Sequence, residues 1–176
     1  DTYLLCGTTN PNPNAGYGLI YIGEINCIDG KFYYLNVPND VGIATSVYGP
    51  NYDPNTGIYT FVGSYTNYSY EVKGFVYSGT LDDSSLKNPN NFSYPSVNTS
   101  YDTTFLHSNS NGLTVGNSGS KSGTISYIYN TNDLTQIKKQ IKFPNSTTTT
   151  TYGIWFNGNN SYTLVGGYSS IEVKIE

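Results

Sequence analysis

The stretch Tyr59-Thr60-Phe61-Val62-Gly63-Ser64-Tyr65-Thr66 decides the fold, because three related stretches recur along the chain of 176 residues. The related stretches are Tyr3-Leu4-Leu5-Cys6-Gly7-Thr8-Thr9-Asn10, Leu113-Thr114-Val115-Gly116-Asn117-Ser118 and Tyr162-Thr163-Leu164-Val165-Gly166-Gly167-Tyr168-Ser169. Their aligned glycines, which are separated by 56, 53 and 50 residues, are Gly7, Gly63, Gly116 and Gly166. A period of this length predicts an array of similar small units.

Three further landmarks follow the glycine motif in a constant order. A second strand is expected at residues 18–21, 74–77 and 126–129. A third element ends at Pro38, Pro95 and Pro144, and a fourth begins around Tyr48-Gly49, Phe105-Leu106 and Tyr152-Gly153. Clusters of Asn, Gly, Pro and Ser between these elements favour turns. Each unit is therefore predicted to hold four short strands in roughly 50 residues, the size of a β-propeller blade.

The composition points to an all-β protein. The chain has 22 Asn, 19 Tyr and 19 Gly but only two Ala, two Gln and no Arg. Tyr, Thr, Val and Ile fit a half-buried pleated surface, and Asn and Gly fit turns, whereas the residues that favour helices are scarce. We expect a single β-repeat domain over 1–176, a propeller-like repeat of about four four-stranded units at approximately 1–38, 39–95, 96–144 and 145–176.

The two terminal units are predicted to be incomplete. With the strands of a unit written a to d, the chain runs bcd, abcd, abcd, abc, which leaves surplus strands in a closed propeller. The last segment, Ile171-Glu172-Val173-Lys174-Ile175-Glu176, alternates apolar and charged residues as a half-buried strand does. Either the native chain continues beyond Glu176, or the terminal strands pair elsewhere, for instance with another copy of the chain.

Charge and targeting signals restrict the function classes. Twelve acidic residues against eight Lys give a net charge of −4, and the largest basic cluster is Lys138, Lys139 and Lys142, so nucleic acid is not an expected partner. No run of apolar residues approaches membrane-spanning length. The absence of Met indicates a processed mature form or a fragment, as expected for an extracellular protein of a cell or particle surface.

Two kinds of covalent modification are possible in a secretory route. Cys6 and Cys27 could form a disulfide between neighbouring strands, and the alternative is two small buried apolar residues. Five Asn-x-Ser/Thr sequons could make the chain a glycoprotein, although a chain so rich in Asn, Ser and Thr produces such matches by chance. The five candidate acceptors are Asn67, Asn91, Asn98, Asn145 and Asn159.

Catalytic constellations are sparse, and we expect the protein not to be an enzyme. His107 is the sole histidine, and although Asp102 and several Ser residues lie near it in sequence, no nucleophile elbow surrounds any Ser. Its position in a repeated strand favours a partly buried structural residue. Asp82 and Asp83 fit a turn that precedes Ser84, so they do not suggest an acid–base pair.

One segment could bind a metal ion. Asn51, Asp53 and Asn55 place oxygen atoms at every second residue before Gly57, a spacing that can surround Ca²⁺. The segment lacks a downstream bidentate Glu and carries one formal charge, so a plain hairpin loop is the favoured interpretation. No other cofactor is expected.

Exposed aromatic and amide side chains provide the best candidates for ligand binding. Most tyrosines fall on expected strands, where they fill the sheets. Tyr68 and Tyr70 lie in an expected loop, and Trp155 lies near Asn157. Such platforms suit sugars, which stack on rings and bond to amides, and they suit protein partners equally.

Several of these segments resemble a known repeat family. Tyr152-Gly153-Ile154, Tyr162-Thr163-Leu164-Val165-Gly166-Gly167-Tyr168 and Val72-Lys73-Gly74-Phe75-Val76-Tyr77-Ser78-Gly79 are similar to the HAF-type repeats of secreted bacterial β-repeat proteins. The second and fourth units match most closely, and the third departs at Gly116-Asn117-Ser118-Gly119. The resemblance implies an extracellular propeller-like fold and transfers no catalytic residue.

The sequence is compatible with two functions. The first is a non-enzymatic structural or self-assembling β-repeat protein that binds other copies through its terminal strands. The second is a lectin-like or protein-binding propeller module that recognises surface glycans or proteins.

Overall fold

The computed structural model describes residues 1–10, 16–26, 29–95, 103–120 and 123–170. It confirms an all-β chain with antiparallel sheets and very little helix. Cys27, Asn98, Asp102 and the segment 171–176 lie outside the described residues. Among the residues that are described, no helix is long and apolar enough to cross a membrane.

The first half of the chain forms two sheets. The first sheet has three strands in the order β1-β2-β3: Tyr3–Thr8, Gly18–Gly23 and Lys31–Leu35. The second sheet has four strands in the order β4-β5-β6-β7: Ala44–Asp53, Ile58–Thr66, Val72–Gly79 and Phe92–Ser93. The link between β6 and β7 contains the short helix α1 (Asp83–Leu86) and a 3₁₀ turn (Pro89–Asn91).

The second half repeats the pattern. The third sheet has the order β8-β9-β10-β11: Thr103–Ser110, Leu113–Ser120, Gly123–Asn130 and Asp133–Ile141. The last sheet is a hairpin of two described strands, β12 (Ser146–Gly158) and β13 (Ser161–Ser170). The four sheets therefore have three, four, four and two described strands, all joined antiparallel to their neighbours.

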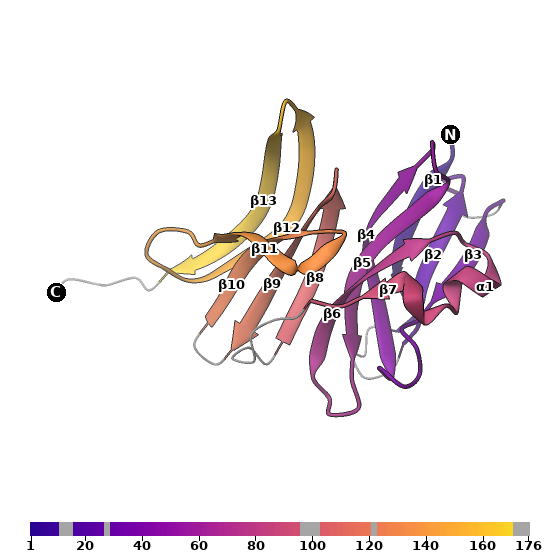
Figure 1. Cartoon of the computed structure of the whole chain (residues 1–176), viewed down its shortest axis with the longest axis horizontal. Helices are drawn as coiled ribbons and strands as arrows, with labels where there is room; N and C mark the ends of the chain where they lie inside the picture. The colour runs from indigo at the N-terminus through magenta and orange to yellow at the C-terminus, as the bar shows by residue number, and fades with distance from the viewer. Residues whose placement is uncertain (11–15, 27–28, 96–102, 121–122, 171–176) are drawn as a thin grey trace.

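The sheets pack against one another in chain order. β4 lies against β1 and β2, β8 lies against β4, β5 and β6, and β12 lies against β8, β9 and β10. Figure 1 shows the sheet β1-β2-β3 and the hairpin β12-β13 at opposite sides of the molecule, with the other two sheets between them. Every substantial contact between sheets in the described part of the chain thus joins neighbours, and the row is open at both ends.

Two apolar cores fill the first two interfaces. Between the first and second sheets, Ile20, Leu35, Phe61, Phe75 and Tyr77 are almost fully buried. Between the second and third sheets, the buried cluster consists of Val62, Val76, Leu106, Tyr127, Tyr129 and Leu134. Along β5, adjacent residues point to opposite faces, so Phe61 faces the preceding sheet and Val62 faces the following sheet.

The repeated glycine has a steric reason in three of the four sheets. Gly63, Gly116 and Gly166 are paired with the first strand of their own sheet, opposite Val47, Leu106 and Thr151. A Cβ atom there would lie closer than 3.0 Å to a backbone carbonyl oxygen, that of Ser46, Phe105 and Thr150 respectively. The exception is Gly7, where a Cβ atom would contact nothing within 4 Å. The first sheet has no strand beyond β1, so nothing crowds its glycine.

The first strands of the last three sheets share an irregularity. The ladder shifts register between Tyr48 and Asn51 in β4, between Leu106 and Ser108 in β8, and between Thr151 and Gly153 in β12. These positions coincide with the aligned landmarks of the sequence. A β-bulge bends its strand and changes the direction of a side chain. Each of these three strands has an aromatic residue at the bulge: Tyr48, His107 and Tyr152.

Candidate functional site

Three equivalent valines of the repeat differ in exposure according to whether a following sheet covers them. Alignment on the repeated glycine makes Val62, Val115 and Val165 equivalent, each facing away from the preceding sheet. Val62 and Val115 are completely buried, whereas Val165 is 62% exposed. The difference arises because no described sheet follows the hairpin β12-β13.

The opposite end of the row also carries exposed apolar side chains. Leu5 of β1 is equivalent to Phe61, Thr114 and Leu164. Phe61 and Thr114 are completely buried, whereas Leu5 is 39% exposed and Leu164 is 38% exposed. Four aromatic side chains of the first sheet and its flank share this outer face and are also exposed: Tyr3, Tyr17, Phe32 and Tyr34. We call this surface the first outer face.

The hairpin β12-β13 carries the other uncovered surface, which we call the last outer face. Trp155 and Asn157 lie on the same side of β12, and Thr163 is paired opposite Trp155. Trp155 is 72% exposed, and the Asn157 amide donates a hydrogen bond of 3.0 Å to the Thr163 hydroxyl. Val165 completes the face. None of the described residues named here on the two outer faces is charged, so contact between these residues would bury no unpaired ion.

The structure separates the four predicted ligand-binding residues into two places. Trp155 and Asn157 belong to the last outer face. Tyr68 and Tyr70 lie in the loop between β5 and β6, and the Tyr68 hydroxyl donates a hydrogen bond to the Asn39 carbonyl. Figure 1 places that loop and the tip of the hairpin β12-β13 at opposite ends of the view. The four residues therefore do not form a single platform.

The predicted metal-binding residues lie at the turn between β4 and β5. The Asp53 carboxylate accepts hydrogen bonds from the Asn55 N–H at 2.9 Å and the Thr56 hydroxyl at 2.8 Å. These bonds lower the pKa of Asp53. Asn51 lies in β4 opposite Thr60, and both Asn51 and Asn55 are exposed. Within the described ranges, no three His, Cys, Asp or Glu side chains gather in a way that could hold a metal ion.

Cys6 carries a free thiol that faces the core between the first two sheets. Burial raises the pKa of this thiol to about 12, so it stays protonated and unreactive at neutral pH. The predicted partner Cys27 lies outside the described residues, and the structure contains no disulfide among the residues that it describes.

The predicted glycan acceptors differ in how their amides are used. Asn67 accepts hydrogen bonds from the Ser69 and Glu71 N–H groups, and Asn91 donates to the Ser85 carbonyl and hydroxyl. Asn145 and Asn159 are exposed at positive φ in turns.

His107 lies among aromatic rings at the bulge of β8. Its ring centroid is 5.8 Å from that of Tyr48, 5.9 Å from Phe105 and 5.1 Å from Tyr152, so the bulge residues of β4, β8 and β12 form one row. No carboxylate is among these neighbours. Burial lowers the pKa of His107 below its ordinary value of 6.5, and the imidazole is neutral at pH 7. The row packs rings of the second, third and last sheets against one another.

Acid should therefore weaken the fold through His107. The unfolded chain binds a proton near pH 6.5, whereas the folded chain resists it, so the free energy of unfolding falls as the pH drops below 6.5. We expect the melting temperature of the wild type to be lower at pH 5.5 than at pH 7.5. In His107→Phe this difference should be smaller. An equal pH dependence in both proteins would contradict the assignment.

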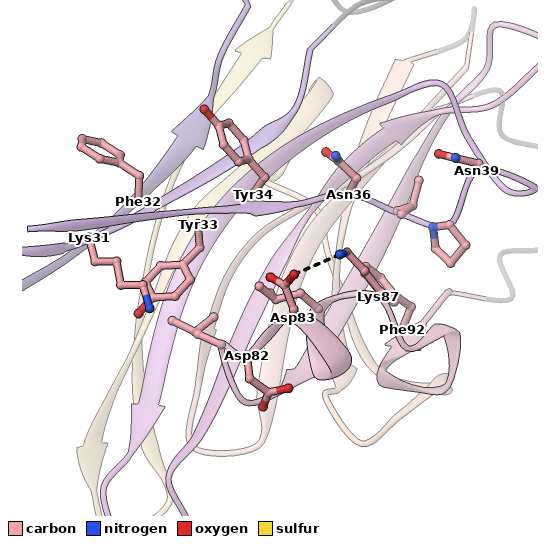
Figure 2. A pocket seen from close by; sticks show the side chains of 14 residues that line it. Lys31, Phe32, Tyr33, Tyr34, Asn36, Asn39, Asp82, Asp83, Lys87 and Phe92 are labelled. Atoms are coloured by element: carbon pink, nitrogen blue, oxygen red, sulfur yellow. Dashed lines mark hydrogen bonds and ion pairs between the residues drawn. The ribbon is translucent and has the colours of Figure 1, made fainter.

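A groove of about 840 Å³ lies between β3 and the segment that contains α1 (Figure 2). Its floor is apolar, formed by Val37, Leu81, Leu86 and Phe92. Lys31 and Tyr33 point from β3 toward α1, whereas Phe32 and Tyr34 point away from it (Figure 2). Sequence reasoning missed this groove because its two walls are separated by almost 50 residues and its α1 wall has no counterpart in the other units.

The α1 wall is held by a local hydrogen-bond network. The Asp82 carboxylate caps α1 by accepting from the Ser85 N–H at 2.9 Å and from the hydroxyls of Thr80 and Ser84. The Tyr77 hydroxyl donates to the Thr80 carbonyl, which ties the segment to the buried core. This wall is preorganised, because its polar groups are bonded to one another.

A scan against protein-family models finds no matching family, and searches of the curated proteins and of the solved structures find no significant match. The resemblance to HAF-type repeats therefore stays a prediction.

Proposed function

We propose that this chain is a non-enzymatic structural protein of a cell or particle surface that assembles with copies of itself, end to end, through its outer faces. The observation that carries the proposal is the difference in exposure among Val62, Val115 and Val165. The surface of the second and third sheets that corresponds to the last outer face is covered by the next sheet of the chain. The surface of the second sheet that corresponds to the first outer face packs on the sheet before it.

The two faces suit each other by the packing mode of the chain itself. Inside the molecule, an aliphatic face such as that of Val62 receives the next sheet, and an aromatic face such as that of Phe61 rests on the previous one. The first outer face is aromatic, and the last outer face presents Val165 at the position of Val62, beside Trp155. Stacking one face on the other would continue the propeller-like series of four units. The contact joins two different surfaces, so copies would form a closed ring or an open filament.

Light scattering over a concentration series tests the proposal. We expect the wild type to exceed the monomer mass of 19.3 kDa, increasingly so at higher concentration. Val165→Lys should return the mass to that of the monomer, because an unpaired ammonium group would be buried in the contact. Ile137→Lys on β11, which is 47% exposed and lies on neither outer face, is the matched control and should assemble normally.

A wild-type protein that stays at 19.3 kDa throughout would overturn the proposal. The exposed ring of Trp155 beside the Asn157 amide would then support the alternative, a carbohydrate-binding module. Saturable binding of a soluble glycan by that monomer, lost in Trp155→Ala, would identify this alternative.

A further inference from the structure

We propose that the groove between β3 and α1 receives an added β-strand, and that this strand is residues 171–176 of a second copy. The inference rests on the self-assembly proposed above and names a segment and a site through which one copy holds the next. It begins with the free edge of β3.

β3 is an edge strand that pairs only with β2 among the described strands. Alternate residues of such a strand direct their N–H and C=O groups away from the partner, where another strand can bond to them. β13 likewise pairs only with β12 among the described strands, whereas the outer edges of β7 and β11 are protected. β7 has two residues, and β11 has register shifts in its pairing and carries Lys138 and Lys139. β1, at the inner edge of the same sheet, lies against β4.

The groove runs along this free edge. Four consecutive residues, Lys31 to Tyr34, line it, which places the cavity beside the backbone of β3 (Figure 2). β3 has five residues, and a strand of six residues is about 20 Å long, so the lengths correspond. An added strand would pair with β3 on one side and lay one row of side chains on the apolar floor of Leu86, Phe92 and Val37.

The segment 171–176 has the pattern that this site requires. Ile171, Val173 and Ile175 alternate with Glu172, Lys174 and Glu176, so one face of an extended strand would be entirely apolar. The rim of the groove offers charges of both signs, from Lys31 and Asp82 and from the ion pair of Lys87 with Asp83 at 3.0 Å. The acidic and basic side chains of the segment can therefore both find partners.

The segment must come from another copy. β13 ends at one side of the molecule and β3 lies at the opposite side, beyond the intervening sheets (Figure 1). Six extended residues span about 20 Å at most, which is too short to cross three sheets that pack roughly 10 Å apart. End-to-end stacking instead brings the last sheet of one copy next to the first sheet of another.

Hydrogen exchange and light scattering on the full chain test the inference. In the assembled wild type, the amides of β3 should exchange at least about tenfold more slowly than in Val173→Glu, which places a charge on the apolar face of the segment. Val173→Glu should also reduce the assembled mass, whereas Lys174→Gln on the other face should not. From the groove side, Lys87→Trp should block the entrance and have the same effect as Val173→Glu. Lys138→Trp on β11 is the control.

The outcomes separate this inference from the proposed function. If Val173→Glu and Lys87→Trp assemble normally with unchanged β3 exchange while Val165→Lys dissociates the copies, the strand addition is wrong and end-to-end assembly stands. Protection of β13 in place of β3 would also overturn the strand addition. A wild type that never exceeds the monomer mass would overturn both.

Discussion

Gly63→Ala should lower the free energy of unfolding by about 3 kcal/mol or more. The new methyl group would meet the Ser46 carbonyl oxygen and the Phe75 ring at less than 3.0 Å, in a fully buried site between β4 and β5. Neither obstacle can yield cheaply, because one is backbone and the other packs in the first core. Gly116→Ala should behave in the same way against the Phe105 carbonyl. Urea denaturation followed by circular dichroism measures the loss.

Gly7→Ala is the matched control. It changes the same position of the same motif, but its Cβ would contact nothing within 4 Å, so we expect a change within about 0.5 kcal/mol. Equal losses at Gly7 and Gly63 would show that the glycine is required for backbone conformation rather than for the close approach of the neighbouring strand.

Asn117→Ala should cost about 2–3 kcal/mol and should loosen the last hairpin before the rest of the chain. The Asn117 side chain is 3% exposed, and its Oδ1 accepts hydrogen bonds from the Thr151 N–H at 2.8 Å and the Ser126 hydroxyl at 2.6 Å. Removing it leaves the buried Thr151 N–H without its acceptor at the contact between the third sheet and β12. This contact has few apolar side chains, so the hydrogen bond between Thr151 and Asn117 contributes a larger share of its stability.

Hydrogen exchange resolved by segment checks this expectation. In Asn117→Ala, amides of β12 and β13 should exchange faster, while those of β5 and β6 should keep their protection. Asn90→Ala, in the exposed 3₁₀ turn, should change neither. Uniform acceleration over the whole chain would indicate that the hairpin does not open by itself.

The class of the fold was accessible from sequence because the relevant signals are local. The β-forming composition and the glycine motif predicted the all-β chain, and the strands expected at 18–21, 74–77 and 126–129 are β2, β6 and β10. The turn expected at Asp82 and Asp83 is instead an N-cap and a one-turn helix. The capping bonds of Asp82 to Ser84 and Ser85 serve either structure, so the sequence could not distinguish them.

The candidate site was less accessible, because exposure depends on neighbours far away in the chain. Val62 and Val165 occupy the same motif position, and only the presence or absence of a covering sheet separates a core residue from a surface residue. Trp155 was singled out as an exposed aromatic residue, but the sequence could not place it beside Val165 and away from Tyr68. Likewise, Lys31 and Leu86 meet across a groove only because the first two sheets pack together.

The row of sheets also determines how the molecule should come apart. Since each sheet is supported only by its immediate neighbours, the chain behaves as a one-dimensional series of coupled units rather than as one indivisible core. The end units lack one neighbour, so they should melt first, and opening should proceed inward from both ends. A copy attached at an end supplies the missing neighbour. Association would then stabilise the two end sheets more than the two inner sheets, because each end sheet would gain a second neighbouring sheet.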